Sequence, residues 1–217
     1  MTIGLKRASG DGGDAALHET KTWPEVNEWR RGTRRALLAQ RMALPRLERE
    51  NARFAIVEEL RKRFDDLRSG CVGIYWPFKG EIDVRRAVGA RCRTSLPVVV
   101  RRGEPLEFWL WRHGTELQPG VWNIPVPATR EVVHPSILLV PLLGFDIDGY
   151  RLGYGGGYYD RTVATMMPRP LLIGIGIEAG RIETICPQPH DIPMDAIVTE
   201  AGFKWIQAKR QPEKSAE

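Results

Sequence analysis

The chain has 217 residues and carries 32 Lys+Arg against 27 Asp+Glu, a formal charge of +5, with 42% hydrophobic residues. That apolar fraction is too high, and the charges are too balanced, for a wholly disordered chain. No run of about 18 apolar residues is present, so the sequence predicts no membrane-spanning helix. Residues 1–22 lack the apolar segment of a secretory signal.

One domain is the expectation at this length. We expect it to cover residues 21–205, with a disordered tail at 1–20, where apolar residues are scarce, and a flexible tail at 206–217. The three cysteines are widely spaced and form no Cys-x-x-Cys pair. This argues against a disulfide framework or a structural zinc site, and it favours a cytoplasmic protein.

The positive surplus lies near the N-terminus. Residues 21–68 hold 13 Lys+Arg and 8 Asp+Glu, a difference equal to the net charge of the whole chain. Such a stretch can face nucleic acid, a membrane or an anionic small ligand, or it can be the solvated face of helices. The charge count alone leaves these alternatives open.

Two helices are predicted first. Thr22 as N-cap and Glu25 in the first turn mark a helix over 25–44, which Pro45 ends. A second helix is predicted over 46–67, because apolar residues recur at helical spacing and form a core stripe: Phe54, Val57, Leu60, Phe64 and Leu67.

Short apolar runs then alternate with helical segments. Further helices are predicted over 82–90 and through Val163, and strands over 71–76, 95–100, 107–111, 136–140, 171–177 and 196–199. Continuous runs bounded by glycine or proline are typical of strands buried on both faces. Their alternation with helices predicts an α/β sheet, in which 107–111 pairs antiparallel with a neighbour.

The segment 145–161 concentrates the polar chemistry. It joins a predicted strand to a predicted helix and is rich in glycine, so bare backbone N–H groups lie at a helix N-terminus and form an anion cradle suited to phosphate. Arg151 and Arg161 add positive charge, and Asp160 can hold Mg²⁺. The spacing is neither a P-loop nor a dinucleotide fingerprint. A tight turn with tyrosines packed on the sheet is the structural alternative.

A longer pattern points to one family. The motif R-x-G-x-G-x-G-Y-Y-D-R at 151–161, after V-P-x-x-G-F-D at 140–146, resembles the signature of the 5-formyltetrahydrofolate cyclo-ligase family, also called methenyltetrahydrofolate synthetases. Shorter matches fall in the same order along the chain, from about residue 30 to residue 200: G-E-I-D at 80–83, W-N-I-P-x-P at 122–127, P-H-D-I-P at 189–193 and V-T-E at 198–200.

The resemblance implies a single-domain, three-layer α/β fold with a mainly parallel central sheet flanked by helices. It also implies a Mg²⁺- and ATP-dependent ligase that converts 5-formyltetrahydrofolate to 5,10-methenyltetrahydrofolate, ADP and phosphate. ATP phosphorylates the N5-formyl oxygen, N10 attacks the iminophosphate, and phosphate leaves. A cradle, arginines and Mg²⁺ supply the positioning and charge neutralisation that phosphoryl transfer requires. The expected partners are therefore small molecules, with the protein a monomer or dimer.

The same resemblance assigns the site residues. Asp160 and Asp191 would bind Mg²⁺. The folate would contact Trp76, Glu81, Trp122 and Tyr158, with Glu81 accepting paired hydrogen bonds from the aminopyrimidine edge of the pterin. ATP would contact Arg30, Arg34, Arg151, Gly153, Tyr154, Gly155, Gly156, Gly157, Tyr158 and Tyr159.

Each assignment has a structural alternative. Glu81 suits the first turn of a helix beginning at Ile82. Asp191 suits an Asx turn before Pro193, and a tryptophan is often simply part of a core.

The first helix departs from the family pattern. Arg30 stands where the family has Lys, and Thr33 where it has Leu; Arg30 and Arg34 share a helical face at i and i+4. Arg and Lys are not interchangeable at a phosphate. This departure keeps open a nucleotide-dependent paralogue with another substrate. A basic nucleic-acid-binding module is the least favoured alternative, because it requires neither Glu81 nor the Gly-Tyr-Tyr-Asp loop.

Overall fold

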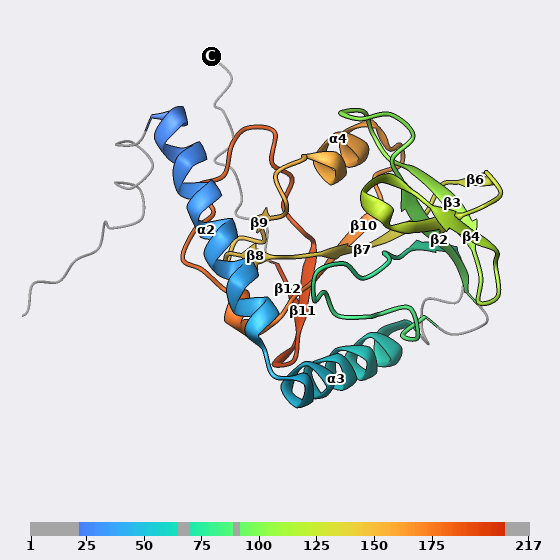
Figure 1. Ribbon diagram of the computed structural model, residues 1–217, viewed down its shortest axis with the longest axis horizontal. Coiled ribbons are helices and arrows are strands. Elements are labelled where there is room, and N and C mark those ends of the chain that lie inside the picture. The colour runs from blue at the N-terminus through green and yellow to red at the C-terminus, as the bar shows by residue number, and fades with distance from the viewer. Residues whose placement is uncertain (1–21, 65–69, 89–91, 207–217) are drawn as a thin grey trace, which may run out of the picture.

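The computed structural model describes residues 22–64, 70–88 and 92–206. The predicted tails at 1–20 and 206–217 lie outside these residues, except for Ile206, whose N–H donates to the Asp195 carbonyl at 2.9 Å. The chain opens with two helices, α2 (Trp23–Ala43) and α3 (Arg46–Phe64), which meet at an angle (Figure 1). No helix in the described part is long and apolar enough to cross a membrane.

The start of α2 is capped as its sequence predicts. The backbone N–H and the hydroxyl of Thr22 both donate to the Glu25 carboxylate, at 2.7 and 2.8 Å. The helix ends two residues before Pro45, which cannot continue it. The predicted helix over 25–44 is therefore confirmed.

The buried face of α3 differs in part from the predicted stripe. Val57 and Leu60 are buried, together with Ala52 and Ile56, whereas Phe54 is 65% exposed. The prediction for Phe54 is wrong because the sheet covers the face defined by the other four residues. The side chain of Phe64 and the predicted last turn through Leu67 lie outside the described residues.

In the described part of the chain, eight strands form the central sheet, in the order β12-β11-β10-β7-β1-β2-β3-β6. The strands from β11 to β2 run parallel, while antiparallel pairings add β12 at one end of the sheet and β3 followed by β6 at the other. The mainly parallel sheet is thus confirmed. The bounds are β1 (Cys71–Gly73), β2 (Arg93–Val98), β3 (Glu107–Trp111), β6 (Val132–Val133), β7 (Ile137–Pro141), β10 (Leu171–Ile175), β11 (Ala196–Thr199) and β12 (Gly202–Trp205).

Two small hairpins project from this sheet. One pairs β4 (Leu117–Pro119) with β5 (Pro125–Pro127) around the 3₁₀ turn η1 (Val121–Asn123). The other pairs β8 (Gly144–Phe145) with β9 (Arg151–Leu152). A second 3₁₀ turn, η2 (Glu178–Gly180), follows β10.

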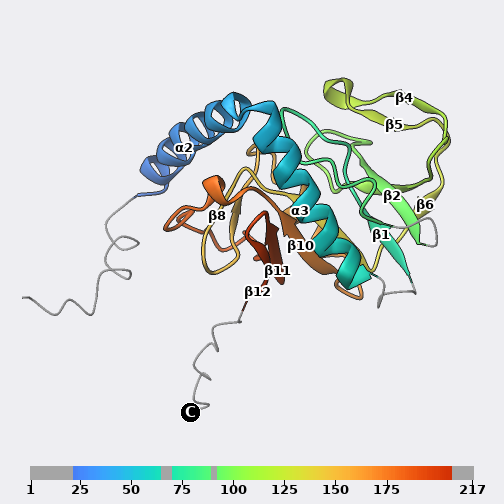
Figure 2. The same ribbon diagram turned by 90° about the horizontal axis from the view of Figure 1, so that it is seen from below.

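Helices cover both faces of the sheet. Alternate residues of each strand point to opposite faces, so β7 contacts helices on both sides. On β7, Ile137 and Leu139 pack in one cluster with Ile56 and Leu60 of α3. Leu138 and Val140 point to the other face and pack with Val163 of α4 (Tyr158–Thr165). Figure 2 shows α3 crossing one face of the sheet. The three-layer prediction is confirmed.

The helix predicted over 82–90 is wrong for the described residues 82–88, which are irregular, with a turn at 85–87. The Tyr75 hydroxyl donates to the Ile82 carbonyl at 2.6 Å, so that carbonyl is already taken. The Asp83 carboxylate accepts from the backbone and the guanidinium of Arg85, at 3.1 and 2.8 Å. Local side-chain bonds of this kind compete with the helical ladder.

Candidate active site

The strand order places a topological switch point between β1 and β7. The chain leaves β1 towards β2 on one side and leaves β7 towards β10 on the other, so the loops after these two strands diverge. In open α/β sheets, ligands bind outside the carboxyl ends of the strands at such a point. The loop after β1 carries Glu81, and the segment after β7 carries the Gly-rich turn.

The Gly-rich turn presents bare backbone at the start of α4. Gly157 is the residue before the helix and has a φ of +62°, and Gly155 has a φ of +88°. Both values lie in the left-handed region, which glycine adopts without steric cost. A Cβ on Gly157 would lie 2.7 Å from Arg161 Nη1. The turn therefore depends on glycine for its conformation and for room beside Arg161.

Two arginines flank this turn. Arg34 of α2 donates from Nε to the Gly153 carbonyl at 3.0 Å, and a Cβ on Gly155 would lie 3.4 Å from its Cζ. Burial, and then the charge of Arg30, lower the pKa of Arg34. Arg161 donates to the Gly156 carbonyl at 2.5 Å and stacks over the Tyr158 ring. The turn thus lies between two guanidinium groups.

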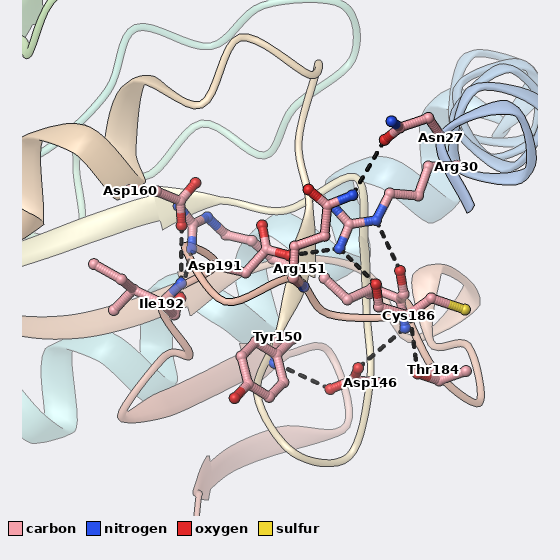
Figure 3. A network of polar contacts seen from close by, with 12 residues as sticks. Asn27, Arg30, Asp146, Tyr150, Arg151, Asp160, Thr184, Cys186, Asp191 and Ile192 are labelled. Carbon is pink, nitrogen blue, oxygen red and sulfur yellow. Dashed lines mark hydrogen bonds and ion pairs between the residues drawn. The ribbon is translucent and has the colours of Figure 1, made fainter. Parts of the chain in front are cut away.

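Arg30 is bound inside the protein. Its side chain is buried, and it donates to the carbonyls of Ile185 and Cys186, at 3.0 and 2.9 Å, and to Asp191 Oδ2 at 2.5 Å (Figure 3). These bonds fasten α2 to the segment before β11. Asp146 holds the same segment by accepting from the Ile185 N–H at 3.1 Å. A phosphate contact for Arg30 stays a prediction.

The two carboxylates predicted to bind metal lie on either side of Ile192. Arg151 pairs with Asp160 Oδ2 at 3.0 Å and donates to the Ile192 carbonyl at 2.8 Å. The Ile192 N–H donates to Asp160 Oδ1 at 3.0 Å (Figure 3). Asp191 precedes Ile192 and accepts from Gln188 N at 2.6 Å and from Arg30. The Asp191 carboxylate thus accepts from a backbone N–H three residues earlier, whereas an Asx turn requires the N–H two residues on, which Pro193 lacks.

The donor set at this point suits Mg²⁺ bound together with phosphate. Mg²⁺ usually takes one or two carboxylates and completes its shell with water and substrate phosphates. Asp160 lies in the first turn of α4, and Asp191 precedes Ile192, whose N–H binds Asp160, so a Mg²⁺ shared by the two carboxylates stays a prediction. Within the described residues, no group of three or more His, Cys, Asp or Glu side chains that could hold a metal ion is found.

Glu81 is a partly buried carboxyl on the opposite loop. Burial raises its pKa to about 7, although the Phe78 N–H, Arg41 and Tyr154 each favour the charged form. The Phe78 N–H donates to its Oε2 at 2.9 Å. No helix begins at Ile82, so the alternative in which Glu81 occupies a first helical turn is wrong.

The three tyrosines of the Gly-rich segment point in different directions. Tyr154 reaches the loop after β1, where its ring packs edge-on against Phe78 with centroids 5.9 Å apart. Tyr158 packs edge-on against Trp122, at 5.7 Å. Tyr159 is partly buried, and burial followed by the charge of Glu81 raises its pKa. Only Tyr154 thus bridges the two loops among these three.

The two predicted folate tryptophans differ in exposure. Trp122 is 57% exposed at the tip of the β4–β5 hairpin, where it and Asn123 have left-handed backbones, with φ of 57° and 59°. It is therefore not a core residue. Trp76 is half-buried, edge-on to Trp111, with the Arg85 guanidinium 4.0 Å from its ring centroid. Trp122 lies beside the Gly-rich turn through its contact with Tyr158, whereas Trp76 packs mainly against Trp111 of the sheet.

Sequence reasoning missed Arg41 and Phe78, which both contact Tyr154. A signal for Arg41 is present. Arg30, Arg34 and Arg41 are spaced i, i+4 and i+11, which places them on one face of α2 together with the buried Leu37. No comparable pattern marks Phe78.

This geometry defines an α/β protein with a Gly-rich turn at a helix N-terminus and a partly buried carboxyl on opposite sides of a switch point. Residues 26–200 match the sequence profile of the 5-formyltetrahydrofolate cyclo-ligase family. The chain belongs to that family, which confirms the predicted family and enzyme class.

Curated relatives and solved structures agree with this family membership. The chain is 30% identical to the 5-formyltetrahydrofolate cyclo-ligase of Mycolicibacterium smegmatis over 182 residues, 76% of this chain and 91% of the relative. It is 30% identical to that of Escherichia coli over 146 residues, 62% of this chain and 80% of the relative. The 5,10-methenyltetrahydrofolate synthetase structure from Aquifex aeolicus superposes with a TM-score of 0.69 at 27% identity, covering 87% and 98% of the two chains. The Mycoplasma pneumoniae structure, at 22% identity and a TM-score of 0.64 over 79% and 98%, supports the fold.

Proposed function

We propose that the protein converts 5-formyltetrahydrofolate and ATP to 5,10-methenyltetrahydrofolate, ADP and phosphate at the carboxyl edge of its sheet. One observation carries the proposal. The Gly-rich turn at the start of α4 and the loop bearing Glu81 lie on opposite sides of the switch point, and Tyr154 contacts both. Such a site can hold a phosphate donor and a second substrate next to each other.

The nucleotide is assigned to the Gly-rich side. The backbone N–H groups of 153–157 and the helix N-terminus favour phosphate oxygens, and Arg34 and Arg161 add positive charge on both sides of the turn. Asp160 and Asp191 would hold Mg²⁺, which would neutralise charge on the nucleotide phosphates. Arg151 and Arg30 fix the positions of these two carboxylates.

The folate is assigned to the opposite side. Glu81, when ionised, would accept two hydrogen bonds from the aminopyrimidine edge of the pterin. Its burial makes such bonds strong, because water competes little for the carboxylate. The exposed ring of Trp122, beside Tyr158, would pack against the bound folate.

The chemistry then requires positioning rather than a protein nucleophile. The γ-phosphoryl group passes to the N5-formyl oxygen, N10 attacks the activated carbon, and the C–O bond to phosphate breaks. The role of the protein is to align the formyl oxygen with the γ-phosphate, to exclude water and to neutralise charge.

The alternatives find little support in the described part of the chain. The Lys-to-Arg departure that suggested a paralogue falls on Arg30, whose donors bind protein acceptors. The basic surplus that suggested nucleic acid consists partly of inward-facing arginines of α2 and partly of side chains paired with glutamates one turn earlier: Arg31, Arg53, Arg61 and Lys62. A cytoplasmic location and a monomeric or dimeric state stay predictions.

The test is a direct assay of purified protein. 5-Formyltetrahydrofolate, ATP and Mg²⁺ are mixed with it, and the methenyl chromophore and ADP are measured together. We expect equal amounts of both products, and none of either with a non-hydrolysable ATP analogue. Folded protein that binds ATP but yields no methenyl product would refute the proposal and favour a different substrate.

A further inference from the structure

Arg41 is a buried arginine near the end of α2 that none of the substrate or metal assignments uses. Only 5% of its surface is exposed. Nη1 donates to the Leu142 carbonyl at 3.3 Å and Nη2 to the Tyr154 hydroxyl at 2.5 Å, while Nε has no hydrogen-bond partner in the structure. A buried guanidinium that is only partly satisfied is costly. Its position therefore suggests a role other than stability.

The contacts of Arg41 reach both sides of the switch point. Leu142 directly follows β7, and Tyr154 belongs to the Gly-rich segment. The Tyr154 hydroxyl also lies 3.4 Å from the Phe78 carbonyl in the loop after β1, and its ring packs on Phe78. Phe78 in turn donates its N–H to Glu81. A continuous path of contacts thus runs from α2 through the Gly-rich segment to the carboxylate.

Arg41 is also the cation that favours the charged form of Glu81. The other titratable groups that face this carboxyl are tyrosines, namely Tyr75 after β1, Tyr154 of the Gly-rich segment and Tyr159 of α4. The nearby Lys79 is exposed, over the rings of Phe78 and Tyr154. The side chains that surround Glu81 from three elements are therefore uncharged near neutral pH, apart from Arg41.

We propose that Arg41 is a positioning residue, which holds Tyr154 against the loop after β1 and thereby fixes the Glu81 carboxylate for the folate. The inference rests on the proposed function, since Glu81 is the group assigned to the pterin. It goes further by coupling the two halves of the site, because the nucleotide-binding segment itself carries the tyrosine that orders the folate loop.

The first test separates charge from geometry with three variants. Arg41→Gln removes the charge and the planar guanidinium with its paired donors. Arg41→Lys keeps only the charge, and Tyr154→Phe removes only the hydroxyl. We expect Arg41→Gln and Tyr154→Phe to raise KM for 5-formyltetrahydrofolate roughly tenfold, the scale of one lost charge-assisted hydrogen bond, and to change KM for ATP much less.

The pH profile distinguishes the variants further. Without the cation, the pKa of Glu81 rises above about 7, so the acid limb of kcat/KM moves to higher pH in Arg41→Gln. Arg41→Lys returns the limb towards that of the wild type without restoring KM. A merely structural role would move neither the limb nor the ratio of the two KM values.

Arg49→Gln is the matched control. Arg49 is another partly buried arginine with an unpartnered Nε, and its Nη2 donates to the carbonyls of Arg41 and Leu44 at the end of α2. We expect this variant to lower Tm while the acid limb and KM for the folate stay unchanged. If Arg49→Gln and Arg41→Gln behave alike, or if Arg41→Gln leaves both quantities unchanged, the inference is overturned.

A readout without substrate keeps this test independent of the proposed function. The side-chain carboxyl ¹³C resonance of Glu81, assigned with Glu81→Gln, is titrated in wild type, Arg41→Lys and Arg41→Gln. A higher titration midpoint in Arg41→Gln alone supports the coupling even if the wild type lacks cyclo-ligase activity. Equal midpoints in all three proteins would contradict it, and a wild type that is folded but inactive would count against the proposed function.

Discussion

Glu81 is the residue whose environment departs most from that of an ordinary carboxyl. Burial raises its pKa from 4.5 to about 7, so the folded protein holds it protonated in a range where the unfolded chain ionises it. The unfolded state then binds fewer protons, and stability falls as pH rises between these two values. Ionising Glu81 in the folded protein therefore lowers stability. Ligand binding explains a carboxyl at this position better than folding does.

Replacing Glu81 by Gln removes that cost. We expect Glu81→Gln to raise the free energy of unfolding at pH 8 by up to about 3 kcal/mol, the equivalent of the pKa shift, with little change at pH 4.5. Urea unfolding at both pH values measures this, with the exposed Glu131→Gln as control. The same variant is expected to lose most of its folate turnover. Equal stability changes at the two pH values would show that Glu81 is not held protonated.

At the scale of elements, one face of α2 builds much of the site. Arg30, Arg34 and Arg41 all point inward from it and contact two segments distant in the sequence, the one before β11 and the one after β7. Arg30 fastens the segment before β11, Arg34 reaches the Gly-rich turn, and Arg41 reaches Tyr154. A helix that looks basic and solvated in the sequence therefore supplies two buried arginines and one half-buried arginine to these two segments.

Arg30 and Arg34 should differ in what they support. We expect Arg30→Lys to lower the free energy of unfolding by about 2–4 kcal/mol, because Lys cannot make the forked bonds to two carbonyls and Asp191. Arg34→Ala should raise KM for ATP severalfold with a much smaller loss of stability. Denaturant unfolding and ATP-dependent kinetics on both variants test this contrast. A large stability loss in Arg34→Ala, or none in Arg30→Lys, would reverse the assignment.

The Gly-rich turn allows a second comparison at this scale. Gly157→Ala places a Cβ on a left-handed residue and 2.7 Å from Arg161 Nη1. Gly114 also has a left-handed backbone, with a φ of +88°, but a Cβ added there would have no atom within 4 Å. Gly114→Ala is therefore the control. Both should lose about 1 kcal/mol of stability through backbone strain, but only Gly157→Ala should raise KM for ATP. An unchanged KM would mean that the turn does not cradle the nucleotide.

At the scale of the whole molecule, the sequence predicts the central strands of the sheet better than the strands at its edges. Continuous apolar runs identify the buried parallel strands, because both faces of those strands are covered. The edge strand β12 and the two-residue strands of the hairpins carry no such signal. The helix predicted over 82–90 is wrong for residues 82–88, because the Tyr75 hydroxyl takes the Ile82 carbonyl and the Asp83 carboxylate takes the Arg85 N–H.

The site shows a similar division. The motif residues of the Gly-rich turn and the loop carrying Glu81 could be named from the sequence, because their order along the chain is distinctive. The contacts of Arg30 and Arg41 could not, because they depend on how α2 packs across loops more than 100 residues away. The spacing of these arginines indicates a shared face but does not identify their partners.

The central claim is that the two loops bring ATP and 5-formyltetrahydrofolate together for phosphoryl transfer to the formyl oxygen. The most direct measurement uses 5-formyltetrahydrofolate labelled with ¹⁸O at that oxygen, with mass analysis of the inorganic phosphate after turnover. Because the phosphorylated oxygen leaves with phosphate, we predict that the label appears in phosphate in proportion to the methenyl product. Label found in water, with unlabelled phosphate, would contradict the account.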